Sequence, residues 1–134
     1  MNVVLDSEAL SAAAQGDLGI QALLLAALTE DSRVILPAVV LAETMTGKAD
    51  DAARWRVVGK ITVVDTTARL AARAGALRDK AAPSRRKKRD LTIDAIVAAT
   101  AESVSPAIIV TADPGDLNLF SLDRVRVKAL AQRG

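Results

Sequence analysis

The sequence predicts an α/β fold, a three-layer α/β/α sandwich around a central parallel sheet of four to five strands. Short apolar runs alternate with longer segments of helical character, and each run is almost continuously apolar. Such runs are typical of strands whose two faces are both covered by helices. A chain of 134 residues with 51% hydrophobic content can bury one core. We therefore expect a single domain over residues 1–134.

The first part of the chain contains two strands and the helices that follow them. Asp17 can accept hydrogen bonds from the first turn of a helix, and Pro37 suits the first turn of another, which Gly47 then ends. The expected elements are a strand at 3–5, an Ala-rich segment at 7–14, a helix at 20–30, a strand at 33–36 and a helix at 38–45.

The second part repeats this alternation. Thr66 or Thr67 can cap a long helix, and Pro106 separates a later helix from the strand that follows it. The expected elements are a helix at 49–58, a strand at 61–65, a helix to about 82, a basic segment at 85–89, a helix at 90–104, a strand at 107–110, a turn at 112–116 and a short fifth strand within 124–130.

The composition excludes several kinds of chemistry. The chain has no histidine and no cysteine, which excludes His-ligated zinc, a Ser-His-Asp or Cys-His nucleophile, iron–sulfur clusters and disulfides. What remains is hard oxygen chemistry, in which Asp and Glu hold Mg²⁺ or Mn²⁺. No apolar run reaches the roughly 20 residues needed to cross a bilayer, and the start lacks the basic region of a signal peptide. We expect a cytoplasmic protein without a membrane segment.

Four acidic residues occupy positions where packing alone would not favour them. Asp6 and Asp113 follow apolar strands, while Glu43 and Asp94 fall on the apolar stripe of expected helices. A buried carboxylate is costly unless a cation neutralises it, and a divalent metal is a common solution. Sites in open parallel sheets form at the carboxyl ends of the strands. If the first and fourth strands are neighbours, these four carboxylates can converge on one metal site.

Each acid has an ordinary structural interpretation when it is taken alone. Asp6 can cap the following helix, and Asp113 can belong to an Asp-Pro-Gly turn. Asp116 can cap a short segment at 117–122. Glu43 and Asp94 can pair with an arginine or reach the rim of the core. The four positions together favour a metal site over separate coincidences.

An uninterrupted basic run precedes the helix that carries Asp94. It can be a solvated loop, or it can contact the phosphates of a nucleic acid at long range. Aromatic residues amount to 1%, which argues against a stacking platform for bases. The candidate RNA-binding residues are Arg85, Arg86, Lys87, Lys88 and Arg89.

Four segments of the chain carry a resemblance to a known family. They are VVLDSEAL (3–10), ILPAVVLAET (35–44), DLTIDAIVAATA (90–101) and VTADPGDL (110–117). With these segments the chain resembles a PIN domain, and more narrowly the small VapC-type toxins of bacterial toxin–antitoxin pairs. The segments occur in the family's order and spacing, and the resemblance covers nearly the whole chain.

The resemblance implies an endoribonuclease with one or two Mg²⁺ or Mn²⁺ ions at each site. The acidic pocket carries over to Asp6, Glu43, Asp94 and Asp113, with Asp116 sharing or supporting the role of the last acid. Ser7 and Thr111 match polar positions that support the first and last acids or orient water. The resemblance also implies a homodimer, neutralised by a small antitoxin in a larger complex.

Three other interpretations fit the sequence less well. A haloacid-dehalogenase-like phosphatase needs a second Asp two residues after the first, where this chain has Glu8. A receiver-like domain needs paired acids after its first strand and a Lys after its last, and neither is clear. A non-catalytic regulatory module, which acts through antitoxin and DNA, is disfavoured by the intact set of acids.

Overall fold

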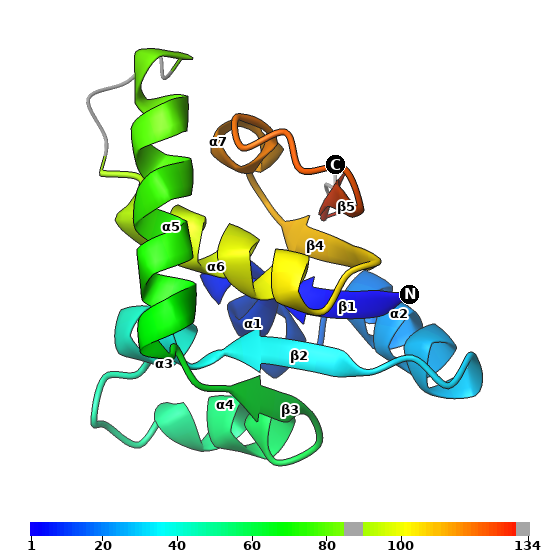
Figure 1. Cartoon of the computed structure of the whole chain (residues 1–134). Coiled ribbons are helices and arrows are strands. Elements are labelled where there is room, and N and C mark those ends of the chain that lie inside the picture. Colours follow the sequence, from blue (N-terminus) through cyan, green and yellow to red (C-terminus); the bar gives the residue numbers. More distant parts are fainter. Residues whose placement is uncertain (85–89, 131–134) are drawn as a thin grey trace.

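The computed structural model describes residues 1–84 and 90–130 (Figure 1). Its centre is one sheet of five parallel strands in the order β3-β2-β1-β4-β5, which confirms the predicted parallel α/β fold. The first and fourth strands are neighbours, as the site prediction required. The strands are β1 (Asn2–Leu5), β2 (Val34–Pro37), β3 (Thr62–Val64), β4 (Ala107–Thr111) and β5 (Val125–Ala129).

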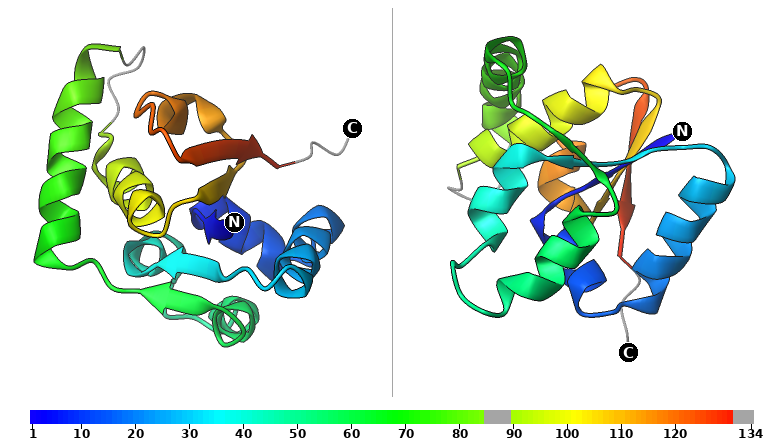
Figure 2. Two further views of the ribbon diagram at one scale, coloured as in Figure 1. Left: turned by 45° about the vertical axis from the view of Figure 1, so that its right-hand side comes forward. Right: turned by 90° about the horizontal axis from the view of Figure 1, so that it is seen from below.

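Helices cover both faces of the sheet and complete the predicted three-layer sandwich. Helix α6 lies against one face with α5 on its outer side, while α1, α2 and α4 lie on the opposite face (Figure 2). The helices are α1 (Ser7–Ala14), α2 (Leu18–Thr29), α3 (Ala38–Thr44), α4 (Asp51–Val58), α5 (Ala68–Ala81), α6 (Thr92–Ser103) and α7 (Pro114–Asn118), with a 3₁₀ turn η1 (Ala82–Ser84) after α5.

Local capping explains where several helices begin. Asp17 accepts a hydrogen bond from Ile20 N at 3.0 Å, and Thr67 Oγ1 accepts one from Leu70 N at 3.2 Å, so both predicted caps are confirmed. Helix α6 begins at Thr92 rather than at residue 90. The reason is that Asp90 Oδ1 accepts hydrogen bonds from Thr92 N at 2.9 Å and Thr92 Oγ1 at 2.6 Å, which holds the chain in a turn before the helix.

The region after β4 differs from the sequence prediction. A turn was expected at 112–116, with Asp116 as the cap of a segment at 117–122; both expectations are wrong, because α7 already begins at Pro114. Asp113 is its N-cap and accepts a hydrogen bond from Gly115 N at 3.1 Å. Proline at the first helical position needs no N–H donor and has a suitable φ, which explains the early start.

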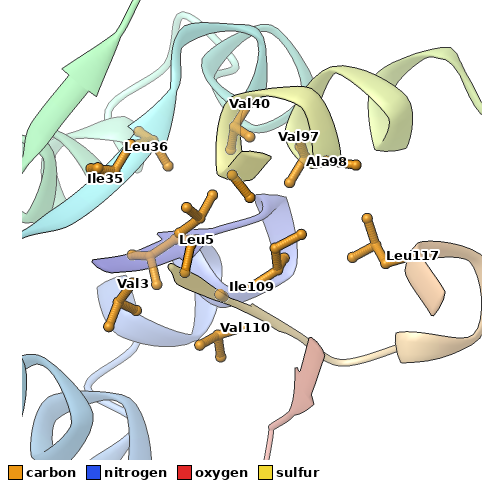
Figure 3. Close-up of a cluster of buried hydrophobic side chains, with 14 of the residues drawn as sticks. Val3, Leu5, Ile35, Leu36, Val40, Val97, Ala98, Ile109, Val110 and Leu117 are labelled. Carbon is orange, nitrogen blue, oxygen red and sulfur yellow. The ribbon is translucent and has the colours of Figure 1, made fainter. Parts of the chain in front are cut away.

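The core lies between the sheet and the helices on its two faces. Side chains from β1, β2, β4, α3, α6 and α7 gather in one cluster, in which Leu5, Leu36 and Val40 have no exposed surface (Figure 3). Pairing of β1 with β4 places Leu5 beside Val110. This register determines which residues meet at the carboxyl end of the two central strands.

Within the described residues, no single helix is both long and apolar enough to cross a membrane. Helices α1 and α2 meet the criterion only as a pair bent by 102°. In this structure α1 buries Ala9, Leu10 and Ala13 in the protein core.

Candidate functional site

The candidate site lies at the carboxyl edge of the parallel sheet, where the chain leaves β1 and β4. Because Leu5 is paired with Val110, the residues that follow them, Asp6 and Thr111, lie side by side. The Asp6 N–H donates to the Val110 carbonyl at 3.3 Å, which extends the pairing to the edge itself. Figure 1 shows α3, the start of α6 and α7 gathered beside this edge.

Asp6 is one of the few charged side chains in the described core, with only 7% of its surface exposed. Its Oδ1 accepts a hydrogen bond from Ala9 N at 2.9 Å, so Asp6 is also the N-cap of α1. This confirms the capping interpretation, and it leaves the second carboxylate oxygen outside the cap. The following residue, Ser7, is half-buried in the first turn of α1.

Thr111 is the last residue of β4, and Asp113 follows in the turn that leads to α7. Thr111 is 1% exposed, and its Oγ1 accepts a hydrogen bond from Asp113 N at 3.1 Å. Thr111 Oγ1 also lies 3.3 Å from the Asp113 carbonyl, to which it donates. The hydroxyl therefore holds the turn that carries Asp113, whose own side chain is exposed. Thr111 supports Asp113 through the backbone in this structure.

Asp94 and Asp116 lie in the first turns of α6 and α7. Helix α6 ends shortly before β4 begins, and its 12 residues span about 18 Å, so its first turn reaches back to the carboxyl edge. Both carboxylates are half-buried. Helix α6 packs against α3 and α7, which brings the elements that carry the candidate acids together.

Glu43 does not lie on the buried stripe that the sequence predicted. The buried residues of α3 are Val40 and Thr44, and Glu43 is exposed. Successive helical residues are rotated by about 100°, so Glu43 points well away from its buried neighbour Thr44. The carboxylate lies on the side of α3 that faces solvent.

The structure assembles the elements of the site but not a ready-made cluster of carboxylates. Within residues 1–84 and 90–130, no group of three or more acidic side chains is placed so as to hold a metal. The donor chemistry suits Mg²⁺ or Mn²⁺, since every candidate is a carboxylate oxygen. The four-acid metal site, with or without Asp116, stays a prediction. The basic run at 85–89 lies outside the described residues.

Asp51, the other buried carboxylate of the described chain, was not predicted from the sequence and is 6% exposed. Hydrogen bonds hold its pKa below the ordinary value of 3.8, above all the bond from Thr46 N. It begins α4, and a signal was available in the sequence. The pair Asp50-Asp51 follows Gly47 closely and precedes a helix, as acids at a helix start often do.

These features define a three-layer α/β protein with acidic residues at the carboxyl edge of a parallel sheet. The family model of the PIN domain matches residues 3–120, and the chain belongs to this family. No curated protein matches the chain.

Several solved structures share the fold. VapBC2 from Rickettsia felis, bound to a DNA fragment from its promoter, has a TM-score of 0.70 at 15% identity, over 98% of this chain and 100% of that chain. VapBC-1 from nontypeable Haemophilus influenzae has a TM-score of 0.72 at 14% identity, over 96% and 98%. FitAcB from Neisseria gonorrhoeae has a TM-score of 0.64 at 22% identity, over 93% and 95%.

Proposed function

We propose that this protein is a Mg²⁺- or Mn²⁺-dependent endoribonuclease, and the toxin of a type II toxin–antitoxin pair. One observation carries the proposal. In a PIN-domain chain without histidine or cysteine, Asp6, Glu43, Asp94 and Asp113 lie on elements that meet around the carboxyl edge of the sheet.

The proposed metal ligands differ in how freely they can reach an ion. Asp6 and Asp113 are each held by a helix cap, whereas Glu43 is exposed and can change rotamer at little cost. We expect Asp6, Glu43 and Asp94 to hold a first ion, and Asp113, supported by Asp116, to complete the site or hold a second. When bound, the metal supplies Lewis-acid stabilisation of the phosphodiester and a nucleophilic water. If water attacks the phosphorus opposite the 3′-oxygen, the P–O3′ bond breaks and the products carry a 5′-phosphate and a 3′-hydroxyl.

The RNA backbone is proposed to contact the basic run at 85–89, which precedes Asp94 closely in the chain. Lys and Arg attract the phosphates without reading the bases. Because these cations are close in sequence to Asp94, they would hold the RNA backbone beside the acidic site. This assignment rests on the sequence alone.

An antitoxin partner is supported by an apolar surface on the other side of the molecule. Helix α2 is largely apolar, with Gln21 and Thr29 as its polar residues, yet the described structure buries only Ile20 and Ala27. Leu18, Leu25 and Leu28 are 71%, 66% and 68% exposed. Single exposed leucines are normal, but several on one helix mark an interaction surface.

Two adjoining cavities of about 280 and 220 Å³ run beside these leucines and share Leu24, Leu28, Lys60 and Ile61. Their cationic rim, Lys60 and Arg33, suits acidic side chains. The structural neighbours VapBC2, VapBC-1 and FitAcB are two-component complexes by name. We therefore assign this groove to an apolar segment of the antitoxin with acidic flanks. A homodimer that joins the antitoxin in a larger complex completes the proposal.

The decisive experiment measures cleavage of RNA by purified, antitoxin-free protein in Mg²⁺ or Mn²⁺, beside Asp6→Asn and Asp94→Asn. Asp31→Asn is the matched control, because Asp31 is an exposed acid at the end of α2 with a φ of 58°, which asparagine tolerates. We expect cleavage by the wild type and the control, and none with EDTA or in either site variant. Cleavage that survives EDTA or both substitutions would falsify the mechanism. An inactive wild type that binds antitoxin and DNA would favour the non-catalytic regulatory role.

A further inference from the structure

Asp51 makes a dense set of hydrogen bonds to the loop that follows α3. Its Oδ2 accepts from Gly47 N at 2.7 Å, and its Oδ1 accepts from Thr46 N at 2.9 Å and from Thr46 Oγ1 at 3.0 Å. Arg54 Nη1 donates to the same Oδ1 at 3.0 Å and forms an ion pair with it. Both carboxylate oxygens therefore have donors from the protein.

These contacts end helix α3. If the helix continued, the N–H groups of residues 46 and 47 would donate to the carbonyls of Ala42 and Glu43, four residues earlier. The last such bond in the structure runs from Met45 N to Leu41 O at 2.9 Å. Asp51 takes the next two donors instead, and Met45 is extended with φ −77° and ψ 140°.

We propose that Asp51 is a positioning residue for Glu43. By ending α3 one residue after Glu43, it sets the position of that residue at the end of the helix. A helix of seven residues is too short to be stable alone, so outside contacts must define its end. The proposal rests on the proposed function only for the role of Glu43 in cleavage.

The link to the rest of the site runs through α1. Helix α1 packs against both α3 and α4, and it begins directly after Asp6. Asp51 belongs to α4, so its hydrogen bonds connect the end of α3 to α4. Helix α4 in turn packs against α1, whose N-cap is Asp6. The Thr46 N–H is the first cause of the lowered pKa of Asp51, which shows that these hydrogen bonds favour the charged carboxylate.

A double-mutant cycle on cleavage tests whether Asp51 acts through Glu43. Asp51→Asn keeps the shape but offers one acceptor oxygen in place of two. Misplacement of a catalytic group by about 1 Å can cost up to about 100-fold, and we expect Asp51→Asn to lower kcat by about 10- to 100-fold in the wild type. In the Glu43→Gln background the same change should cost less than about twofold, because coupled residues are not additive. The exposed control Asp123→Asn should change neither background.

Equal fold losses in both backgrounds would overturn the proposal, since a purely structural residue affects each alike. An NMR comparison of residues 42–47 tests the helix end without any need for activity. We expect Asp51→Asn to change their Cα shifts and amide exchange. Unchanged values would show that Asp51 does not determine the end of α3.

If the wild type cleaves no RNA, the proposed function fails while the NMR result still decides the role of Asp51. If Asp51→Asn does not fold, Thr46→Val is the second variant, because it removes the hydroxyl but keeps the Thr46 N–H donor to Asp51. It should lower kcat by a smaller factor, with the same dependence on Glu43. An unchanged kcat in Thr46→Val would overturn the proposal.

Discussion

Asp6 has a capping role and a proposed metal-binding role, and two substitutions can separate them. Its Oδ1 caps α1 through Ala9 N at 2.9 Å, and its side chain is buried at the candidate site. Asparagine caps helices as well as aspartate does, but it carries no charge. Alanine removes both the acceptor and the charge. The pair of variants therefore distinguishes loss of the cap from loss of the ligand.

The capping effect can be estimated from the structure. Loss of an N-cap acceptor costs about 1 kcal/mol, within a range of about 0.5 to 2. Unfolding entropy is about 2.1 cal/mol/K per residue, so for 134 residues this cost lowers Tm by about 3 to 4 °C. We expect this decrease for Asp6→Ala without metal. Asp6→Asn should stay within about 0.5 kcal/mol of the wild type.

Stabilisation by bound metal adds to the effect of the cap, and both are measured from the same melting curves. A ligand at 100 times its Kd stabilises the folded state by about 2.7 kcal/mol. If loss of one carboxylate weakens Mn²⁺ binding about 100-fold, the same concentration stabilises by only about 0.4 kcal/mol. The assay is thermal unfolding followed by circular dichroism, with MnCl₂ and with EDTA, for the wild type and both variants.

Two results would refute this reasoning. An equal Mn²⁺-induced shift in the wild type and Asp6→Asn would show that Asp6 is not a ligand. A metal-free Tm for Asp6→Asn as low as that of Asp6→Ala would show that the buried charge, and not the capping acceptor, stabilises the fold.

Further predictions concern other parts of the chain. Arg73 holds the pKa of Glu102 below its ordinary value of 4.5, chiefly by hydrogen bonding, so this stabilisation is present above that value and is lost as pH falls through the lowered pKa. Both side chains are substantially exposed, so Glu102→Gln should lower the free energy of unfolding by no more than about 1 kcal/mol at pH 7. It should also flatten the acid side of a plot of Tm against pH. An unchanged acid side would contradict this prediction. Leu25→Asp should keep the wild-type Tm within about 2 °C, because Leu25 is 66% exposed. The same variant should weaken antitoxin binding at least about 10-fold in a titration. Binding with wild-type affinity would show that the antitoxin does not occupy this groove. Neutralising four cations of the 85–89 run should weaken RNA binding and flatten its dependence on salt, and an unchanged slope would make the run an ordinary solvated loop.

Most of the fold could be predicted because its signals are local. Apolar runs indicated the strands, Asp17 and Thr67 indicated helix starts, and the alternation of elements indicated a parallel sheet. The errors are also local in origin. At 112–116 an Asp-Pro-Gly sequence suits both a turn and the start of a helix. The structure has the helix, α7, which packs against α6 and β5.

Glu43 shows why spacing within a short helix is a weak guide to burial. The sequence predicted that Glu43 lies on the apolar stripe of its helix, whereas the structure buries Val40 and Thr44 and leaves Glu43 exposed. With only seven residues, small rotations of α3 decide which side chains meet α6 and α1. Asp51 was missed for a related reason, since its role depends on a loop that folds back onto its carboxylate.

The sequence by itself determined the parallel α/β fold, the restriction to carboxylate donors and the location of a basic run, because composition, periodicity and capping act over a few residues. Only the tertiary structure decided that β1 lies beside β4, so that Asp6 neighbours Thr111, and that Asp51 ends the helix of Glu43. These relations join segments that are distant in the chain or fold back through a loop. They depend on the pairing of whole strands and the packing of whole helices, which no short stretch of sequence encodes.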